Sequence, residues 1–350
     1  MKKVWGVLLA AAMVIGSMAG CASSGEEQTE AAPAAEGEGT AAAEVSEDET
    51  YVYMCPLSSL EYWQAYRVGL EDACAELGVT AKFVGDDGIE ADAMCAVLET
   101  LINDPTTAGI MTNGHFPEAY EPYFVQALEK GIPVVYTGGG CETPTVAITT
   151  LGSDYVEYGA LMLDQAAEAC GGKGQVIVSQ ALVSGGTPAQ QVMEGIHKQI
   201  ENYPDMEIVA EVDDQSDAAV AASKIGAALL ANPDTAVIIG CQAPSGIGAV
   251  TAVKEAGMGD QVKIVCIDRD AATLEYIKSG DIYSTVAGKQ YTEAYYGTKI
   301  LYDYRHGSKQ AFSNDDTEAG MVIAPSFIDT GSLIINQDNV DYFLDFSYAK

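Results

Sequence analysis

The feature that most constrains the fold is an alternation of short apolar runs with longer amphipathic segments, which begins after Thr50 and continues almost to the C-terminus. The short runs are rich in β-branched residues and predict strands, whereas the longer segments carry apolar residues at helical spacing. A strand, a helix and a second strand within roughly thirty residues are typical of a parallel βαβ unit. The chain is therefore predicted to be an α/β protein with doubly wound parallel sheets.

The alternation falls into two series, which predict two lobes. In the first series we expect strands at 51–54, 81–84, 109–112, 133–136 and 146–149, with helices at 62–77, 90–102 and 117–130. In the second we expect strands at 175–179, 208–212, 236–239, 262–267 and 283–287, with helices at 155–170, 188–202, 216–231, 245–256 and 271–279. A helix at 291–304 and a strand at 332–336 remain. Two such units imply a cleft where strand ends and loops converge.

The N-terminus carries an export signal. Lys2 and Lys3 precede an apolar run that ends in Met18-Ala19-Gly20-Cys21, a pattern that predicts a signal peptide over residues 1–20. The run is too short to span a membrane comfortably. It resembles a bacterial lipoprotein signal, in which Cys21 becomes the lipidated N-terminus, although Met18 stands where leucine is more usual. The resemblance implies an extracytoplasmic protein that a lipid anchor holds at the cell membrane.

Residues 21–50 and the overall charge narrow the class of partners. The segment after Cys21 has nine acidic residues and no Lys, Arg or aromatic residue, so it predicts an acidic flexible tether. The chain has 51 acidic and 17 basic residues, and loss of residues 1–20 would change its net charge from −34 to −36. Such a surface repels phosphate backbones and anionic lipid heads. We expect no nucleic-acid partner and no membrane contact except the lipid anchor.

The reactive residue types do not form a catalytic or metal-binding pattern. The eight cysteines are dispersed without a CxxC motif, and we interpret them mainly as small buried hydrophobes. His115, His197 and His306 lack companions at metal-ligand spacing, and His197 is expected in a solvated or capping role. The glycines at 138–140 lack the GK[ST] ending of a phosphate-binding loop. We therefore expect no enzyme activity, no metal and no cofactor.

A series of short motifs occurs in a fixed order along residues 51–340: Glu61-Tyr62-Trp63, Asn103-Asp104-Pro105, Gly131-Ile132-Pro133, Gly152-Ser153-Asp154, Met193-Glu194-Gly195, Gly246-Ile247-Gly248, Ile267-Asp268 and Asp329-Thr330-Gly331. In their order and spacing these motifs resemble the type I periplasmic sugar-binding proteins, the ribose- and galactose-binding group that supplies ATP-binding cassette importers. The resemblance implies a hinge with three crossings, near 152–154, 289–290 and 329–331. The N-terminal lobe is then 51–153, the C-terminal lobe 154–289, the return to the first lobe 290–330, and the final strand and tail 331–350.

A site for a polar solute needs aromatic faces and groups that pair with hydroxyls. By the resemblance, Tyr62 and Trp63 match the family's aromatic pair, although Trp63 also fits the buried stripe of its helix. Asp268, at a strand end, matches the acidic residue that binds sugar hydroxyls. Four further residues are expected at the cleft: Asp87, Asn113, His115 and Asp154. For two of them an alternative stays open, since Asp87 could lie in a solvated turn and Asp154 could cap the following helix instead of contacting the solute.

The remaining positions combine matches with departures. Lys289 or Gln290 takes the place of the family's amide. Gln190 or Val192 stands where an arginine is expected, Gln242-Ala243 replaces Asn-Asp, and Gly138-Gly139 replaces Asp-Arg. Because these hydroxyl-binding groups are absent, we expect ribose, galactose and glucose to bind more weakly than about 1 mM. Arg269 and Lys289 suggest a solute with an acidic or electron-rich group, unless they are salt-linked structural residues.

The predicted function is that of a lipid-anchored binding protein without enzyme activity. It would capture a small polar solute, a sugar or a sugar-like molecule, and close around it like a hinge. Closure changes the outer surface, so an ATP-binding cassette permease could tell the loaded form from the empty one. The alternative is a sensor subunit that presents the same closed form to a membrane receptor or kinase.

Overall fold

The structure, a computed structural model, describes residues 48–56, 58–59, 61–88, 90–139, 145–182, 186–306 and 324–344, without the side chains of residues 61, 186 and 187. The predicted signal peptide, the lipidation site Cys21 and all but the last three residues of the predicted tether therefore lie outside the described residues. Among the described residues, no helix is both long and apolar enough to cross a membrane.

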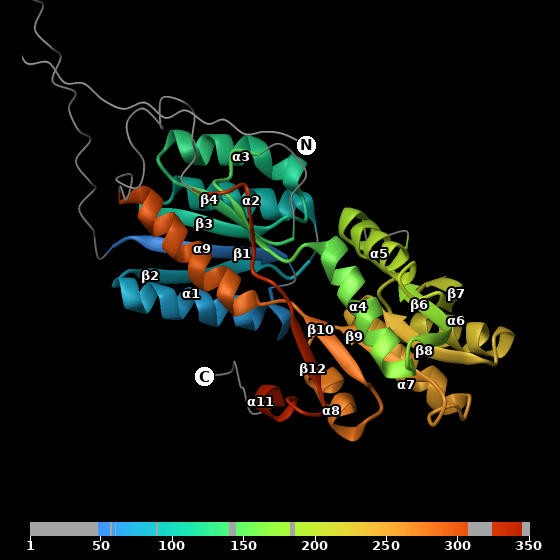
Figure 1. Cartoon of the computed structure of the whole chain (residues 1–350). Coiled ribbons are helices and arrows are strands. Elements are labelled where there is room, and N and C mark those ends of the chain that lie inside the picture. Colours follow the sequence, from blue (N-terminus) through green and yellow to red (C-terminus); the bar gives the residue numbers. More distant parts are fainter. Residues whose placement is uncertain are drawn as a thin grey trace, which may run out of the picture. The chain divides into compact units, whose positions relative to one another are not determined.

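The first sheet has the strand order β11-β5-β4-β3-β1-β2, and its strands are parallel. Helices α1 and α9 cover one face of this sheet and α2 and α3 the other (Figure 1). The strands are β1 (Thr50–Pro56), β2 (Thr80–Asp86), β3 (Thr107–Asn113), β4 (Val134–Gly138), β5 (Thr150–Gly152) and β11 (Phe327–Asp329). The helices are η1 (Glu61–Trp63), α1 (Gln64–Leu77), α2 (Ala91–Asn103), α3 (Pro117–Glu129) and α9 (Gln290–Arg305).

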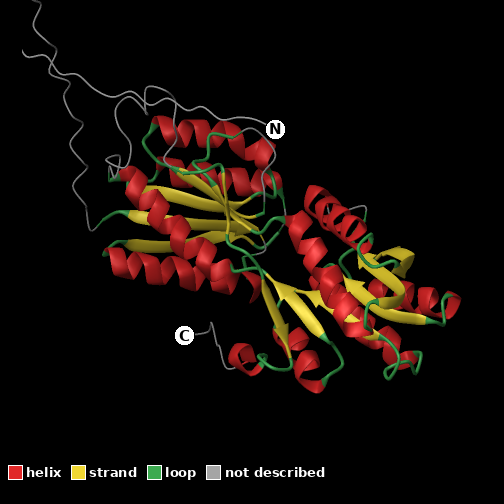
Figure 2. Cartoon of the chain, in the orientation of Figure 1, coloured by secondary structure: helices red, strands yellow, loops and turns green. Residues whose placement is uncertain are grey.

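The second sheet has the order β12-β10-β9-β8-β6-β7, and only β12 runs antiparallel to its neighbour (Figure 2). Helices α4 and α5 pack on one face, and α6, α7 and α8 pack on the other. The strands are β6 (Lys173–Gln180), β7 (Asp205–Asp213), β8 (Thr235–Gly240), β9 (Lys263–Ile267), β10 (Ser284–Ala287) and β12 (Leu333–Asn336). The helices are α4 (Tyr155–Cys170), α5 (Gly186–Ile200), α6 (Ala218–Ala231), α7 (Ala243–Glu255), α8 (Ala271–Ser279) and α11 (Asp341–Leu344).

The chain passes between the two sheets at three places: from β5 to α4, from β10 to α9, and from β11 to β12. Two of these segments are hydrogen-bonded to each other. The Thr330 amide donates to the Gly152 carbonyl at 2.8 Å, and the Ser153 hydroxyl donates to the Gly331 carbonyl at 3.2 Å. Each sheet thus contains one strand, β11 or β12, that comes from the last part of the chain.

The structure differs from the sequence-based expectation at several places; strand β11 and helix α11, for example, were not expected. The strand predicted at 146–149 begins later, at Thr150, because the Glu121 carboxylate accepts hydrogen bonds from the Val146 amide and the Thr145 hydroxyl. Only the end of the predicted segment bonds to β4: the Ile148 amide donates to the Val134 carbonyl at 2.8 Å, and the Thr149 carbonyl accepts from the Tyr136 amide at 3.0 Å. The end of the predicted tether is also folded. Glu49 is buried and forms ion pairs with Arg305 and His306, next to the start of β1.

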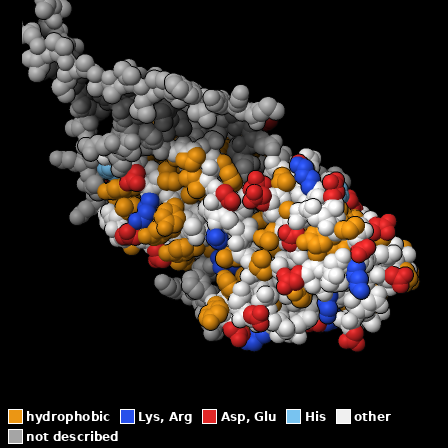
Figure 3. Space-filling model, in the orientation of Figure 1, with side chains coloured by type: hydrophobic (Ala, Val, Ile, Leu, Met, Phe, Trp, Pro, Cys, Tyr) orange, Lys and Arg blue, Asp and Glu red, His pale blue; other side chains and the backbone are white. Residues whose placement is uncertain are grey.

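The cysteines and the surface charge follow the sequence-based expectation where they are described. The six described cysteines are free thiols, and Cys55, Cys74, Cys241 and Cys266 are buried within apolar clusters. Cys21 and Cys141 lie outside the described residues. On the face shown in Figure 3, acidic side chains are scattered among apolar and neutral ones, without a basic patch.

Candidate functional site

The first group of candidate residues lies at the carboxyl ends of strands in the first sheet, which meet at one edge because the strands are parallel. Trp63 follows β1 in the 3-10 helix η1 and is buried in the cluster formed with α1, as the core alternative predicted. Its ring centroid lies 4.8 Å from that of Tyr62, edge to face, and 6.5 Å from that of His115. Although the ring is buried, its Nε1 has no hydrogen-bond partner among the described residues.

Asn113 is the last residue of β3 and presents a second buried donor at this edge. It is buried, and its Oδ1 accepts a hydrogen bond from the His115 amide at 3.3 Å. That contact orients the side-chain amide, so the group left without a described partner is the Nδ2 donor. An unpaired buried donor costs about 1–3 kcal/mol, which makes its presence at a strand end a sign of function rather than of packing.

Asp268 directly follows β9 in the second sheet and has a strained backbone. Its φ is 70°, in the left-handed region that a residue with a Cβ seldom adopts. The Thr285 hydroxyl donates to its carbonyl at 2.6 Å, and its amide donates to the Val286 carbonyl at 3.0 Å. No described group donates to its carboxylate. Burial raises the pKa of Asp268 to about 7, the charge of Asp270 adds to this shift, and Arg269 opposes it.

Gln290 begins α9, where the chain returns from β10 to the first sheet. It is buried, and its Oε1 has no described hydrogen-bond partner. Lys289 precedes it as the N-cap residue of α9, without a side-chain capping bond. Of the two alternatives for this position, Gln290 is the one with an unsatisfied buried atom.

The two sheet edges approach each other at Tyr62. This side chain is 40% exposed, yet the surrounding protein desolvates its hydroxyl and raises its pKa well above the usual value. Asp268, Tyr155 and Glu293 raise the pKa of Tyr62 further through their charges. Partial exposure together with a desolvated hydroxyl is typical of a side chain in the wall of a cleft. The groups that act on Tyr62 come from both lobes: Asp268 and Tyr155 from the second, and Glu293 from the first.

Glu293 is the main residue of this cluster that the sequence analysis did not identify. Its side chain is buried, and Oε2 accepts hydrogen bonds from the Tyr66 hydroxyl and the Gly138 amide, both at 2.9 Å. Burial raises the pKa of Glu293 to about 8, while hydrogen bonds from Tyr66, Gly138 and Thr330 oppose the shift. Glu293 lies in the helix predicted at 291–304, three residues after Gln290, and this spacing was the signal that could have placed both on one face.

Tyr155, the first residue of α4, was also not identified, and it explains one of the departures noted above. A Cβ on Gly139 would lie 1.8 Å from the Tyr155 ring, so only glycine leaves room for the ring there. The amide of the preceding residue, Gly138, donates a hydrogen bond to Glu293 Oε2. The glycine pair at 138–139 therefore admits a phenol and a carboxyl from two other elements.

Two predicted residues have hydrogen-bond partners outside this cluster. Asp154 is the N-cap of α4: its Oδ1 accepts hydrogen bonds from the amides of Val156 and Glu157 at 2.8 and 3.2 Å, as the capping alternative predicted. Asp87 is exposed after β2 and accepts a hydrogen bond from the Ser58 hydroxyl at 3.5 Å. His115 is exposed and contacts the site through its ring packing against Trp63.

Gln242 and Gln190 lie farther along the edge of the second sheet. Gln242 follows β8 and caps α7, and its Nε2 donates to Oε1 of Gln180 at 2.6 Å. Gln190 is exposed on α5, whereas Val192 is buried, so Gln190 is the residue of this pair that reaches solvent. In the part of the chain that the structure describes, no three His, Cys, Asp or Glu side chains are placed to hold a metal ion.

Comparison with known proteins gives consistent matches. The sequence model of the periplasmic binding protein domain matches residues 51–309. The xylitol-binding protein of Mycolicibacterium smegmatis is 29% identical over 198 residues, which are 56% of this chain and only 55% of that protein. The D-apiose import binding protein of Actinobacillus succinogenes is 24% identical over 237 residues, 67% of this chain and 74% of that protein.

Among solved structures, the arabinose-binding protein AraP from Geobacillus stearothermophilus is 27% identical and superimposes with a TM-score of 0.78. The superposition covers 85% of this chain and 99% of AraP. The predicted fold class, two doubly wound parallel-sheet lobes, is confirmed. The named relatives are binding proteins rather than enzymes.

Proposed function

The chain belongs to the periplasmic binding protein family, and from this premise we propose that it binds a small neutral polyhydroxylated solute between its two lobes and delivers it to an ATP-binding cassette permease. The proposed site is formed by Tyr62, Trp63, Asn113, Asp268 and Gln290. It takes no cofactor and performs no reaction.

The observation that carries the proposal is a set of buried polar atoms without partners at the facing sheet edges. Trp63 Nε1 and Asn113 Nδ2 are donors and Gln290 Oε1 is an acceptor, all three buried and without a partner among the described residues. The half-buried carboxylate of Asp268 adds a second acceptor. A hydroxyl both donates and accepts, so a polyhydroxylated solute satisfies both kinds of group. The exposed ring of Tyr62 adds an apolar face.

The charge of the site favours a neutral solute over an acidic one. Asp268 and Glu293 both act on the hydroxyl of Tyr62, and each is a carboxyl whose ionisation an anionic solute would oppose. The charge of Arg269 lowers the pKa of Asp268 but offsets only part of the rise that burial and Asp270 cause. The relatives named for xylitol, D-apiose and arabinose point to sugars and polyols as the first solutes to test.

The experiment is a thermal-shift screen of residues 21–350 against xylitol, D-apiose, L-arabinose, ribose, galactose, glucose and disaccharides. A ligand at 100 times its Kd should stabilise the protein by roughly 2.7 kcal/mol, so a true solute raises Tm by several degrees. Ribose, galactose and glucose should give the smallest shifts. Absence of a shift with every sugar and polyol would contradict the proposed solute class.

We also propose that Cys21 carries the lipid anchor; this rests on the sequence, because Cys21 lies outside the described residues. Cys21→Ser should move the protein from the membrane fraction to the soluble extracytoplasmic fraction without changing the Tm of the folded domain. Cys170→Ser is the matched control, since Cys170 is a partly buried free thiol of α4. If Cys21→Ser stays in the membrane fraction as fully as Cys170→Ser, the anchor lies elsewhere.

A further inference from the structure

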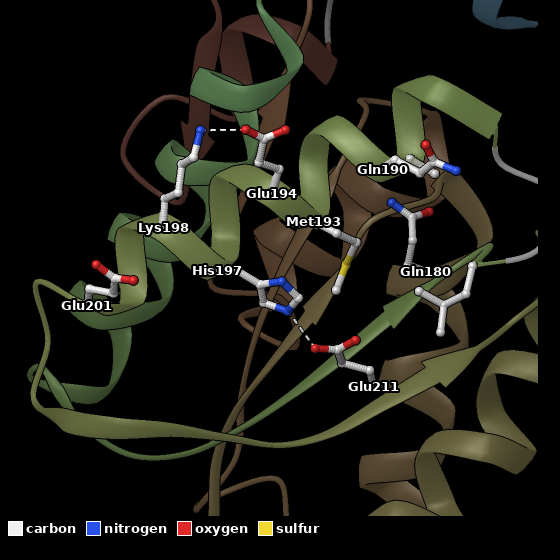
Figure 4. A pocket seen from close by; sticks show the side chains of 10 residues that line it. Gln180, Gln190, Met193, Glu194, His197, Lys198, Glu201 and Glu211 are labelled. Atoms are coloured by element: carbon white, nitrogen blue, oxygen red, sulfur yellow. Dashed lines mark hydrogen bonds and ion pairs between the residues drawn. The ribbon is translucent and has the colours of Figure 1, made fainter.

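A separate cavity of about 470 Å³ lies against helix α5 in the second lobe (Figure 4). Its walls come from α5, from the end of β6 and from the edge strand β7. The volume is within the range of about 300–1,000 Å³ that small-molecule sites occupy. Among the residues assigned above, only Gln190 lines it.

Gln180, the last residue of β6, presents an unpartnered donor in this cavity. It is 1% exposed, and its Oε1 accepts hydrogen bonds from the Ala181 amide at 2.8 Å and from Gln242 at 2.6 Å. The Ala181 amide identifies the acceptor atom as oxygen, so the group without a described partner is the Nε2 donor. A buried side-chain NH₂ without a hydrogen-bond partner lowers the stability of the fold unless a ligand supplies an acceptor.

The other walls favour a neutral group with an apolar face. Met193 and Leu182 provide apolar surface, and the amide of Gln190 lies at the same end as Gln180 (Figure 4). At the other end, His197 Nε2 contacts Glu211 Oε1 at 2.5 Å. Three carboxylates line the cavity, those of Glu194, Glu201 and Glu211. The one lysine in the lining, Lys198, forms an ion pair with Glu194. This charge repels anions.

The cavity continues the edge on which the proposed site lies. Asp268 follows β9, Gln242 follows β8 and Gln180 ends β6, and these three strands are consecutive in the sheet. Neighbouring strands lie about 4.8 Å apart, so Asp268 and Gln180 are separated by two spacings, on the order of 10 Å. That distance matches two linked sugar rings better than one. The Gln180–Gln242 hydrogen bond connects the two regions.

We propose that this cavity is a second subsite and that the cognate solute is a two-unit molecule, a disaccharide or a glycoside. This inference rests on the proposed function: the first unit occupies the site at Asp268. The second unit is neutral, presents a hydroxyl or ring oxygen to Gln180 Nε2, and places an apolar face on Met193.

Calorimetric titration of residues 21–350 with matched pairs tests the inference: xylose and xylobiose, arabinose and arabinobiose, glucose and cellobiose, glucose and maltose. We expect a disaccharide of at least one pair to bind at least tenfold more tightly than its monosaccharide. Gln180→Glu keeps an oxygen for the Ala181 amide and replaces the unpartnered NH₂. It should remove most of this tenfold gain while leaving the Kd of the monosaccharide within twofold.

Gln126→Glu on α3 is the matched control, because Gln126 is exposed and its Nε2 donates only to a backbone carbonyl. Gln190→Leu tests the same cavity from the exposed face of α5 and keeps the test independent of the stability of Gln180→Glu. Equal affinity within every pair, or a gain that both cavity variants retain, overturns the subsite and leaves the proposed function standing. No binding of any probe overturns both.

Discussion

Replacement of Asp268 by glycine is expected to weaken solute binding at least tenfold while it stabilises the empty protein. The variant removes the carboxylate, an acceptor whose charge-assisted hydrogen bonds contribute about 1.5–3 kcal/mol each. It also relieves the backbone, because glycine adopts a φ of 70° without the penalty, on the order of 1 kcal/mol, that a Cβ introduces. Calorimetry with the tightest solute from the screen measures the first effect, and urea unfolding the second.

Two further variants make this test specific. Asp268→Ala should lose the same affinity but be less stable than Asp268→Gly, because alanine keeps the Cβ in the left-handed region. Asp260→Ala, at an exposed position next to β9, should change neither property. Unchanged affinity in both Asp268 variants would remove this residue from the site and would show that its strain has another origin.

Glu293→Gln is expected to make the protein more stable at alkaline pH and to flatten its pH dependence. The pKa of Glu293 is raised from 4.5 to about 8 in the folded state. Between these values the folded protein keeps a proton that the unfolded chain has released, so the free energy of unfolding falls as the pH rises. The loss is complete above pH 8 and amounts to about 5 kcal/mol at most. Glutamine resembles the neutral acid and avoids this loss.

Urea unfolding at pH 5, 7 and 9 measures the effect as the difference between parent and variant. The difference should be small at pH 5 and largest at pH 9, with the variant more stable. Glu129→Gln, at an exposed position that ends α3, is the control and should give a difference that does not grow with pH. A constant difference for Glu293→Gln would mean that the carboxyl is already ionised in the folded protein near neutral pH.

The local elements, and the positions of several residues of the proposed site at strand ends, could be predicted from the sequence because short-range signals specify them. Helix α8 was predicted with its observed bounds, since Asp270 caps its start and Gly280 ends it in the left-handed conformation. Asp268 and Asn113 were proposed for a related reason: polar residues that end or directly follow apolar strands lie at the sheet edge where ligands of such folds bind. A helix was likewise predicted at 291–304, where the structure has α9, and the resemblance assigned this segment to the first lobe.

Only the tertiary structure decided which distant residues meet. Tyr66 and Glu293 are separated by 227 positions and Gly138 and Glu293 by 155, so no local pattern relates them. The roles of Gly139 and Gln180 depend equally on partners from other elements: a ring at the start of α4 and an amide after β8. Sequence periodicity indicates which face of an element is apolar. It does not indicate the burial that raises the pKa of Glu293 or the hydrogen bonds that occupy Gln180 Oε1, because both arise only when separate elements pack together.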